Sequence, residues 1–407
     1  MEILFIGPFG LHPKYTVSGR ALPLAQALAR RGHHIRLLIP PWDHPADSGQ
    51  RVVIDGVQVE QIQLPPHVPA VEHGLIVWRL LRSAFTSGAD VIHVFKPKGY
   101  SGVVALVLWC LKRLGIIHAR LVVDTDDWEG PGGWNDRGEY NLLARRIFAW
   151  QERWGLAHCD AVTGASHTLQ SLARSLAPRG RPVCYVPNGL LDLPDLPPRE
   201  LARSQLNLGD GPVILIYTRF VEIGPEHLGS IVAALLKRLA DTYILVVGEG
   251  LSDELERFRD CLVGMGSRAC LPSWWDRVRL VGWVERADLP CYWSAADLAL
   301  FPCEDNLLTR SKSPLRLVEM MAAGLPIIAH GVGEAEHYLE HRTSGILISP
   351  GNDQEFIEAA SELALSPGLR RYLGERARRR VQHDFNWRHL VERVEAVYTD
   401  ITGLREL

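Results

Sequence analysis

One short stretch combines a helix start with side chains that could bind an anion. In "SKSPLRLVEMMAAGLP" (residues 311–326), Ser313 is a good N-cap, and Pro314 suits the first helical position. We therefore predict a helix over residues 315–323 that ends at Gly324 and is followed by a strand. The start of such a helix has unpaired N–H groups and the positive end of a dipole. It therefore predicts a site for phosphate or other electron-rich oxygens.

A glutamate lies within this otherwise mostly apolar helix. A carboxylate such as that of Glu319 is rarely buried without a partner. One alternative is a surface ion pair with Arg316, three residues earlier. The other is that Glu319 points along the edge formed by the helix start and holds a ligand there.

A second acidic stretch follows a predicted buried strand in "LVVDTDDWEGPGGW" (residues 121–134). Asp124 and Asp126 form an Asp-x-Asp pattern, and carboxylate oxygens suit Mg²⁺ or Mn²⁺. The Asp-x-Asp pattern is common by chance, and it does not suit the two-domain layout that we predict below. We therefore predict no metal site. His93, near the end of another strand, is typical of a hydrogen-bonded core histidine.

Composition limits the class of protein. The chain has 407 residues, 47% hydrophobic and 22% charged, which predicts a globular protein of two domains. A net charge of −3 argues against nucleic acid as a partner. Seven cysteines without paired spacings fit a reducing cytosol. The start, "MEILFIGPFG", has no basic segment and predicts a first strand instead of a signal peptide.

Apolar runs alternate with helical patterns twice along the chain, which predicts two doubly wound parallel α/β sheets. In the first half we expect strands at 3–6, 35–39, 91–95, 121–124, 161–164 and 183–186, and helices at 18–31, 102–114 and 145–158. The second half restarts with strands in "PVILIYTRF", "TYILVVGEG", "RVRLVGWV", "ADLALFPC" and "LPIIAH". The expected division is a first domain at 1–190, a linker at 191–211, a second domain at 212–385 and a terminal helix at 386–407.

The longest apolar run, residues 102–117, is interrupted by Lys112 and Arg113 and is too short for a membrane span, so it predicts a core helix. The neighbouring "HGLIVWRLLRSAF" (residues 73–85) is typical of an amphipathic helix packed on a sheet. Its alternative is peripheral contact with a membrane. We expect a cytoplasmic protein. In the alternative case, the protein would contact the inner face of the membrane peripherally.

Eight motifs in order resemble a retaining glycosyltransferase of family four. They are "SGR", "DVIHVFKP", "VPNG", "YTRF", "VVGEG", "LVGWV", "ADLALFP" and "SPLRLVEMMAAGLPIIA". The resemblance covers nearly the whole chain. It implies the GT-B fold, in which two Rossmann-like domains face each other across a cleft. It also implies transfer of a sugar, without a metal or other cofactor, from a nucleotide-diphosphate sugar to a hydroxyl of a glycan, lipid-linked or small-molecule acceptor. It favours no oligomeric state.

The resemblance also implies roles for residues of the second half. Arg219 matches the arginine that binds the donor diphosphate, and a guanidinium suits that task. Glu319 matches the glutamate that holds the ribose hydroxyls. Backbone at Gly282 and Trp283 would contact the base. Backbone at Ser313, Pro314 and Leu315 would lie against the sugar or phosphate.

In the first half, Gly19 matches a glycine loop that approaches the phosphates, and Asn188 and Gly189 match an architectural turn. Loops at 10–20 and 124–140 would bind the acceptor. Asp126 and Asp127 stand where many relatives have a histidine that touches the sugar. These carboxylates would bind donor hydroxyls or orient the acceptor, and we count them with Arg219 as catalytic candidates.

Besides these acids in place of a histidine, two further departures from the family pattern bear on function. Ser311 replaces a glutamate that helps grip the sugar, although a subset of the family with "SPLKLxEYMA"-type helices shares this change. Ile223 replaces a phosphate-binding lysine, for which Arg316, Lys312 or Arg310 could substitute. Two alternatives therefore stay open. One is a GT-B nucleotide-sugar-binding or partner protein without turnover, and the other is a sugar-nucleotide epimerase.

Overall fold

The computed structural model describes residues 1–12, 14, 16–68, 71–137, 140–268 and 274–403. The chain divides into two compact units. The N-terminal unit comprises Met1–Leu191, Ser311–Ser313 and Phe385–Leu407, and the C-terminal unit comprises Asp192–Arg310 and Pro314–Asp384. Both units are α/β, so the predicted fold class is confirmed at the level of each unit.

An eight-stranded sheet in the order β3-β4-β2-β1-β5-β6-β7-β8 forms the centre of the N-terminal unit. Its strands are β1 (Glu2–Ile6), β2 (His34–Ile39), β3 (Arg51–Ile54), β4 (Val57–Gln61), β5 (Val91–Phe95), β6 (Arg120–Thr125), β7 (Ala161–Gly164) and β8 (Val183–Tyr185). All neighbouring strands are parallel except β3, which pairs with β4 in a hairpin. The apolar runs form the inner strands because a parallel sheet is covered on both faces.

The hairpin β3–β4 was not predicted. Its turn is formed by Asp55 and Gly56, which both have positive φ, of 45° and 84°. An Asp-Gly pair between apolar runs is the usual signal for such a turn, because both central residues must adopt a left-handed backbone.

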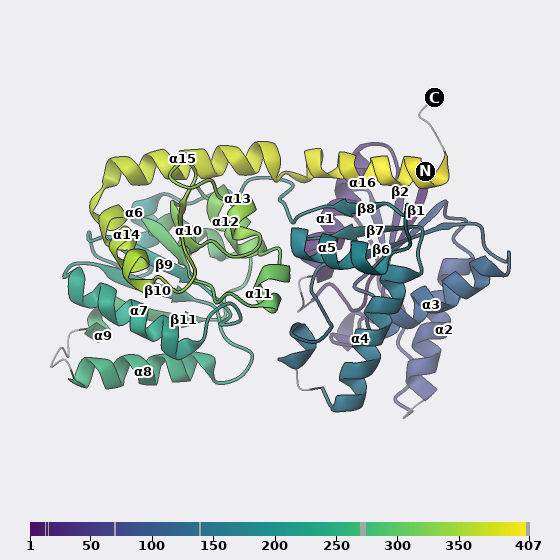
Figure 1. The fold of residues 1–407 in the computed structure, drawn as a ribbon, viewed down its shortest axis with the longest axis horizontal. Helices are drawn as coiled ribbons and strands as arrows, with labels where there is room; N and C mark the ends of the chain where they lie inside the picture. Colours follow the sequence, from purple (N-terminus) through teal and green to yellow (C-terminus); the bar gives the residue numbers. More distant parts are fainter. Residues whose placement is uncertain (13, 15, 69–70, 138–139, 269–273, 404–407) are drawn as a thin grey trace. The chain divides into compact units, whose positions relative to one another are not determined.

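Helices of the N-terminal unit cover both faces of its sheet. They are α1 (Leu22–Arg30), α2 (Val71–Phe85), α3 (Tyr100–Arg113), α4 (Leu142–Ala157), α5 (His167–Leu176) and α16 (Trp387–Thr402), with short turns η1 (Val17–Ala21), η2 (Pro45–Asp47) and η3 (Trp134–Asp136). The C-terminal helix α16 lies against α1 (Figure 1) and buries Trp387, Val391 and Tyr398 in the core of this unit.

His93 is a hydrogen-bonded core residue, as predicted. Its ring is fully buried, with Nδ1 2.6 Å from the Tyr398 hydroxyl of α16 and Nε2 3.0 Å from the Thr163 hydroxyl. Burial lowers the pKa of His93 to about 4, so the ring is neutral at physiological pH.

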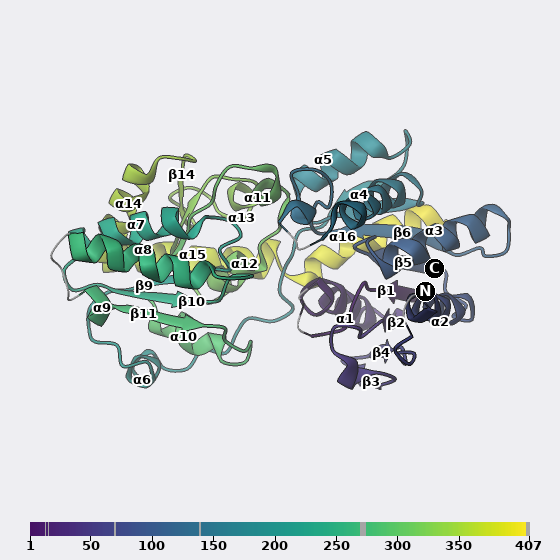
Figure 2. The same ribbon diagram turned by 90° about the horizontal axis from the view of Figure 1, so that it is seen from below.

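The C-terminal unit is built on an all-parallel sheet in the order β11-β10-β9-β12-β13-β14. Its strands are β9 (Val213–Tyr217), β10 (Tyr243–Val247), β11 (Val278–Gly282), β12 (Leu298–Phe301), β13 (Ile327–His330) and β14 (Ile346–Ile348). Its helices are α6 (Arg199–Gln205), α7 (Pro225–Arg238), α8 (Glu254–Arg268), α9 (Trp274–Arg277), α10 (Leu289–Ala295), α11 (Leu307–Ser311), α12 (Leu315–Ala322), α13 (Ala335–Tyr338), α14 (Asp353–Leu365) and α15 (Pro367–Asp384). Figure 2 shows α7 and α8 on one side of β9, β10 and β11, with α10 on the other.

Two local predictions differ from the structure. The expected linker at 191–211 contains helix α6, whose Ala202 and Arg203 are buried. Helix α12 begins at Leu315 with Pro314 as its N-cap, and Ser313 lies one residue before the N-cap. The Ser313 hydroxyl instead accepts a hydrogen bond from the backbone N–H of Asn188 at 2.9 Å. Ser313 therefore lies near the helix start, as predicted, but its hydroxyl stabilises the turn at Asn188 and does not cap the helix.

In the part of the chain that the structure describes, no helix combines the length and the apolar character that crossing a membrane requires.

Candidate functional site

In the C-terminal unit, Arg219 lies just beyond the carboxyl end of β9. The chain turns at Phe220, which has a φ of 53° and a buried side chain that packs against Phe258. The Phe220 N–H bonds the Thr218 hydroxyl at 2.9 Å, which stabilises this left-handed conformation. Non-glycine residues with positive φ are uncommon and cluster at ligand-binding turns.

Trp283 lies beside Arg219. The Arg219 guanidinium carbon is 5.8 Å from the centre of the indole ring, and 42% of the Trp283 surface is exposed. Contact with the indole face holds the guanidinium in one orientation. Its N–H groups lie in the plane of the guanidinium and can still donate hydrogen bonds to a ligand. The structure thus brings together Arg219 and Trp283, two of the predicted donor-side residues.

Two glycines shape the adjoining turns. Gly248 and Gly282 follow β10 and end β11, and the Gly248 N–H bonds the Gly282 carbonyl at 2.8 Å. Their φ values are 110° and 76°. A Cβ on Gly248 would lie 2.0 Å from the Thr218 carbonyl oxygen, so only glycine fits there.

Glu319 is buried on α12 and pairs with an arginine that the sequence analysis did not identify. Its Oε1 lies 3.1 Å from Nη2 of Arg286, which is 43% exposed. Burial raises the pKa of Glu319, opposed by Arg286 and Arg316. The buried position excludes a role as an exposed surface charge.

The alternative Arg316–Glu319 pair was wrong. Arg316 donates to Glu222 Oε1 at 2.6 Å, and its guanidinium lies 5.8 Å from the ring centre of Tyr217. Glu222 is buried and precedes Ile223, so the ion pair links the turn after β9 to the start of α12. Much of the positive charge of Arg316 is therefore already neutralised.

The two further departures from the family pattern are both buried. Ile223 belongs to the apolar core around β9 and α7. Ser311 is fully buried in the N-terminal unit, where its carbonyl accepts a 2.7 Å hydrogen bond from the Ser166 hydroxyl. Neither position offers a charged group.

In the N-terminal unit, Asp124 is already engaged. Both carboxylate oxygens accept from Arg20, at 2.8 Å and 2.7 Å, and Oδ2 also accepts from the Thr163 hydroxyl. Arg20 also donates to the Val186 carbonyl and the Asn188 side chain. The carboxylate of Asp124 is bound to the buried guanidinium of Arg20, so it does not serve as the first ligand of an Asp-x-Asp metal site.

Gly19 lies next to Arg20, in a π-helical turn that leads directly into α1. Gly19 therefore lies within the helix predicted at 18–31, and its approach to the donor phosphates stays a prediction. Gly189 is confirmed as architectural, because a Cβ there would lie 2.4 Å from the Phe385 carbonyl oxygen.

Asp126 and Asp127 lie in a short segment, residues 125–129, which we call the acid loop. Both carboxylates face Lys96, whose Nζ is 3.6 Å from Asp126 Oδ1 and 2.6 Å from Asp127 Oδ2. Thr16 also donates to Asp126 Oδ2 at 2.6 Å. The structure thus brings the two predicted acids together with a lysine that the sequence analysis missed.

The surroundings of the acid loop shift the pKa values of Asp126 and Asp127 in opposite directions. Burial raises the pKa of Asp126, and the nearby Lys96 does not compensate. Burial also acts on Asp127, but Lys96 and Lys312 outweigh it and lower the pKa of Asp127. At neutral pH Asp127 is therefore an ionised partner of Lys96.

Glu152 of α4 holds both ends of the acid loop. Its Oε1 is 2.9 Å from the Thr125 hydroxyl, and its Oε2 accepts from the Glu129 N–H at 2.6 Å. Burial, with added repulsion from Glu129, raises the pKa of Glu152 to about 8. Glu152 therefore carries a proton at neutral pH.

Replacing Glu152 by glutamine tests this protonation. The folded pKa of about 8 exceeds the reference value of 4.5, so the stability due to this group is complete below pH 4.5 and is lost as pH rises toward 8. Glutamine does not titrate. Relative to wild type, Glu152→Gln should gain on the order of a few kcal/mol between pH 5 and pH 8. Urea unfolding at the two pH values measures this difference, and an equal difference at both would contradict it.

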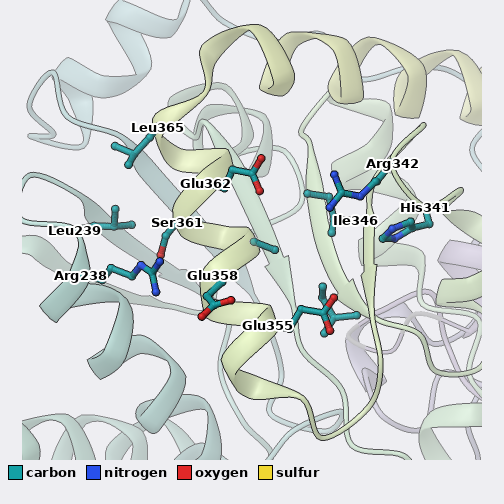
Figure 3. Close-up of a pocket in the computed structure, with 12 residues that line it drawn as sticks. Arg238, Leu239, His341, Arg342, Ile346, Glu355, Glu358, Ser361, Glu362 and Leu365 are labelled. Carbon is teal, nitrogen blue, oxygen red and sulfur yellow. The ribbon is translucent and has the colours of Figure 1, made fainter.

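A pocket of about 480 Å³ lies elsewhere in the C-terminal unit (Figure 3). Its charged lining includes Arg238 at the end of α7, Arg342, and three glutamates of α14, Glu355, Glu358 and Glu362. None of the predicted site residues lines this pocket. The candidate site is therefore defined by the strand ends described above.

Residues 17–189 match the family described as "Glycosyl transferase 4-like domain", and residues 211–365 match "Glycosyl transferases group 1". These two matches, with the two doubly wound units described above, identify the chain as a glycosyltransferase of the GT-B type.

Known proteins agree with this class. The chain is 25% identical over 392 residues to N-acetyl-alpha-D-glucosaminyl L-malate synthase of Bacillus anthracis, covering 93% of this chain and 92% of that protein. Sucrose-phosphate synthase of Thermosynechococcus elongatus has a similar fold, with a TM-score of 0.73 at 22% identity, covering 99% and 100% of the two chains. HepE of Anabaena, in complex with UDP-glucose, has a TM-score of 0.69 at 18% identity, covering 99% and 100%.

Several charged residues of the candidate site escaped the sequence analysis, among them Lys96, Glu222 and Arg286. Lys96 directly follows β5, and Glu222 lies five residues after the end of β9. A charged residue just after a strand is a candidate site residue, so the sequence did contain a signal for these two. Arg286 lies in a loop after β11 and has no local pattern that distinguishes it.

Proposed function

We propose that this chain is a retaining glycosyltransferase of family four, of the subset with an "SPLRLVEMMAAG"-type donor-site helix. It transfers a sugar from a nucleotide-diphosphate sugar to a hydroxyl of a glycan, lipid-linked or small-molecule acceptor. The transfer needs neither a metal nor another cofactor. The single observation that carries this proposal is the position of Arg219, fixed beyond the end of β9 by a left-handed turn and by Trp283.

The chemistry places its main demand on the leaving group. Negative charge grows on the diphosphate as the sugar–oxygen bond breaks, and preorganised donors stabilise that charge. Arg219 can donate two parallel hydrogen bonds to phosphate oxygens. Arg316 is paired with Glu222, so Arg219 carries most of this task.

The remaining steps need no protein nucleophile. A leaving phosphate oxygen accepts the proton of the attacking hydroxyl on the same face of the sugar, and the configuration is retained. Glu319 holds the ribose, the backbone at residues 313–315 lies near the sugar or phosphate, and Trp283 with Gly282 contacts the base. Asp126 and Asp127 orient the acceptor hydroxyl.

A donor panel tests the proposal. UDP-, GDP-, ADP- and dTDP-sugars are added singly, and thermal unfolding and nucleotide release are measured with and without EDTA. One nucleotide series should raise the unfolding midpoint, because a ligand of the folded state stabilises it by mass action. Turnover should survive EDTA, and the product should keep the anomeric configuration of the donor by NMR. Turnover lost with EDTA, or an inverted product, would contradict the mechanism.

A second candidate is a nucleotide-sugar-binding or partner protein without turnover. It is favoured by the buried Ile223 and Ser311, which supply neither the lysine nor the glutamate of the family pattern. It predicts a melting shift with no nucleotide release. A sugar-nucleotide epimerase would instead convert the donor sugar without an acceptor.

We also propose that the enzyme acts in the cytoplasm and contacts the inner membrane face peripherally. The supporting observation is α2, where Trp78 and Phe85 are 51% and 55% exposed and Arg82 lies over the Trp78 ring. Exposed aromatic rings beside arginines suit an anionic lipid surface.

Trp78→Ser should reduce cosedimentation with phosphatidylglycerol-containing vesicles several-fold, since it removes the largest exposed apolar side chain of α2. The matched control is Leu251→Ser, at an exposed leucine of the C-terminal unit. Equal binding of wild type and Trp78→Ser, or equal binding to vesicles of phosphatidylcholine alone, would overturn the membrane proposal.

A further inference from the structure

Lys96 is held in an unusual conformation at the end of β5. Its φ is 48°, in the left-handed region that non-glycine residues rarely adopt. Two hydrogen bonds stabilise this turn, because the Lys96 N–H bonds the Asp124 carbonyl at 2.9 Å and the Lys96 carbonyl accepts from the Ser101 hydroxyl at 2.5 Å. Such conformations persist where the surroundings enforce them, and they concentrate at functional sites.

The Lys96 ammonium group forms ion pairs with three carboxylates. Besides Asp126 and Asp127, it lies 3.3 Å from Glu129 Oε1. The side chains of Lys96, Asp126 and Glu129 are 9%, 9% and 1% exposed. Three carboxylates this close repel one another, and the positive charge of Lys96 offsets this repulsion.

The acid loop is also rigid. Glu152 bonds both of its ends, and Asn135 donates to the Glu129 carbonyl at 2.6 Å. Trp128 packs so closely on Gly133 that a Cβ there would lie 2.0 Å from the Trp128 carbonyl oxygen. The carboxylates therefore keep fixed positions.

Two buried carboxylate oxygens of this cluster, Asp126 Oδ1 and Glu129 Oε1, accept no hydrogen bond from the residues that the structure describes. The side chain of Glu129 is 1% exposed and that of Asp126 is 9% exposed, so a ligand can approach Asp126 more easily. The other oxygen of Asp126 is oriented by Thr16. A buried carboxylate oxygen without a donor is costly, and an ionised carboxylate can only accept. The matching ligand group is a hydrogen-bond donor such as a sugar or polyol hydroxyl.

We propose that Lys96 is a positioning residue for the acceptor, which fixes the acid loop so that Asp126 Oδ1 accepts a hydrogen bond from an acceptor hydroxyl. This inference rests on the proposed glycosyl transfer and deepens it, because it names the group that presents the acceptor. Lys96 itself does not touch the reacting atoms.

The first test measures stability and needs no substrate. Lys96→Met leaves the carboxylates of Asp126, Asp127 and Glu129 without their shared cation, so the pKa of Asp127 should rise above its unfolded value and that of Asp126, which burial already raises, should rise further. Stability is then present at low pH and is lost as pH rises through the raised values. The other charged groups that face this cluster are Lys14, Lys98, Asp124, Glu152 and Lys312, and they are unchanged in the variant.

The unfolding midpoint of Lys96→Met should therefore fall further below wild type at pH 8 than at pH 5, and Lys96→Arg should recover much of the loss. A midpoint difference that is the same at both pH values would show a packing role only and would overturn the proposal.

The second test uses turnover with the donor that the panel identifies and a hydroxyl acceptor. Lys96→Met should raise the KM for the acceptor at least tenfold, leave the KM for the donor and the nucleotide-induced melting shift unchanged, and be partly rescued by Lys96→Arg. Lys112→Met is the matched control, because Lys112 pairs with Asp160 in the same unit, away from the acid loop. Equal changes in both KM values would overturn the inference. Failure of every donor to bind would instead reject the proposed function.

Discussion

Replacing Arg219 by alanine is expected to remove most of the nucleotide-induced stabilisation of this protein. Two charge-assisted hydrogen bonds to the diphosphate would be lost, on the order of 3 kcal/mol or about a hundredfold in Kd. Turnover should fall by roughly 10²- to 10³-fold, since the same donors stabilise the leaving group. Differential melting against the selected nucleotide and a nucleotide-release assay measure the two effects.

Glu319→Ala should weaken the same melting shift, because the ribose loses its carboxylate partner. Arg257→Ala is the matched control, since Arg257 is an exposed arginine of the same unit that pairs with Glu226. It should leave the shift unchanged. If Arg219→Ala and Glu319→Ala both shift like wild type, the donor-site assignment is wrong.

The second large effect is expected in stability. Arg20→Met removes the cation from a buried pair in which both side chains are almost inaccessible, at 2% and 0% exposure. Asp124 would remain buried without its counter-ion, and breaking such a pair costs about 3–5 kcal/mol. The urea midpoint of the transition that unfolds the N-terminal unit measures this cost.

The control for Arg20 is Arg31→Met. Arg31 pairs with Glu395 at 2.7 Å but is 37% exposed, so solvent screens the pair and its loss should cost only about 1 kcal/mol or less. The double variant Arg20→Met/Asp124→Leu should recover part of the loss, because no charge remains buried. A single-variant cost similar to that of Arg31→Met would contradict the argument.

Much of the fold could be predicted from local patterns. Apolar runs bounded by turns predicted strands such as β1, β5 and β9, because inner strands of parallel sheets need apolar residues on both faces. The pattern failed for β14, which has only three residues, and for α6, whose Pro- and Asp-rich surroundings resemble a linker. Short elements are stabilised by tertiary packing that leaves little periodicity in the sequence.

The candidate site was predictable in its residue types but not in its pairings. Arg219 and Asp127 were candidates because they stand at functional positions of the family pattern that the sequence resembles, and both follow strands. The partners of Arg316 and Asp127 lie 94 and 31 positions away, at Glu222 and Lys96. No local spacing connects such residues, so the nearer Arg316–Glu319 pair was considered instead. Charge pairs are decided by side-chain reach in three dimensions, which the sequence does not display.

The place of α16 in the chain has a consequence for biosynthesis. Trp387 and Tyr398 complete the core that begins with β1, and the His93–Tyr398 hydrogen bond joins residues 305 positions apart. The first 190 residues therefore leave the ribosome with an apolar surface uncovered, and they must wait for the second unit to be translated. Chaperone protection during that interval would be most useful at the patch that Trp387 later covers.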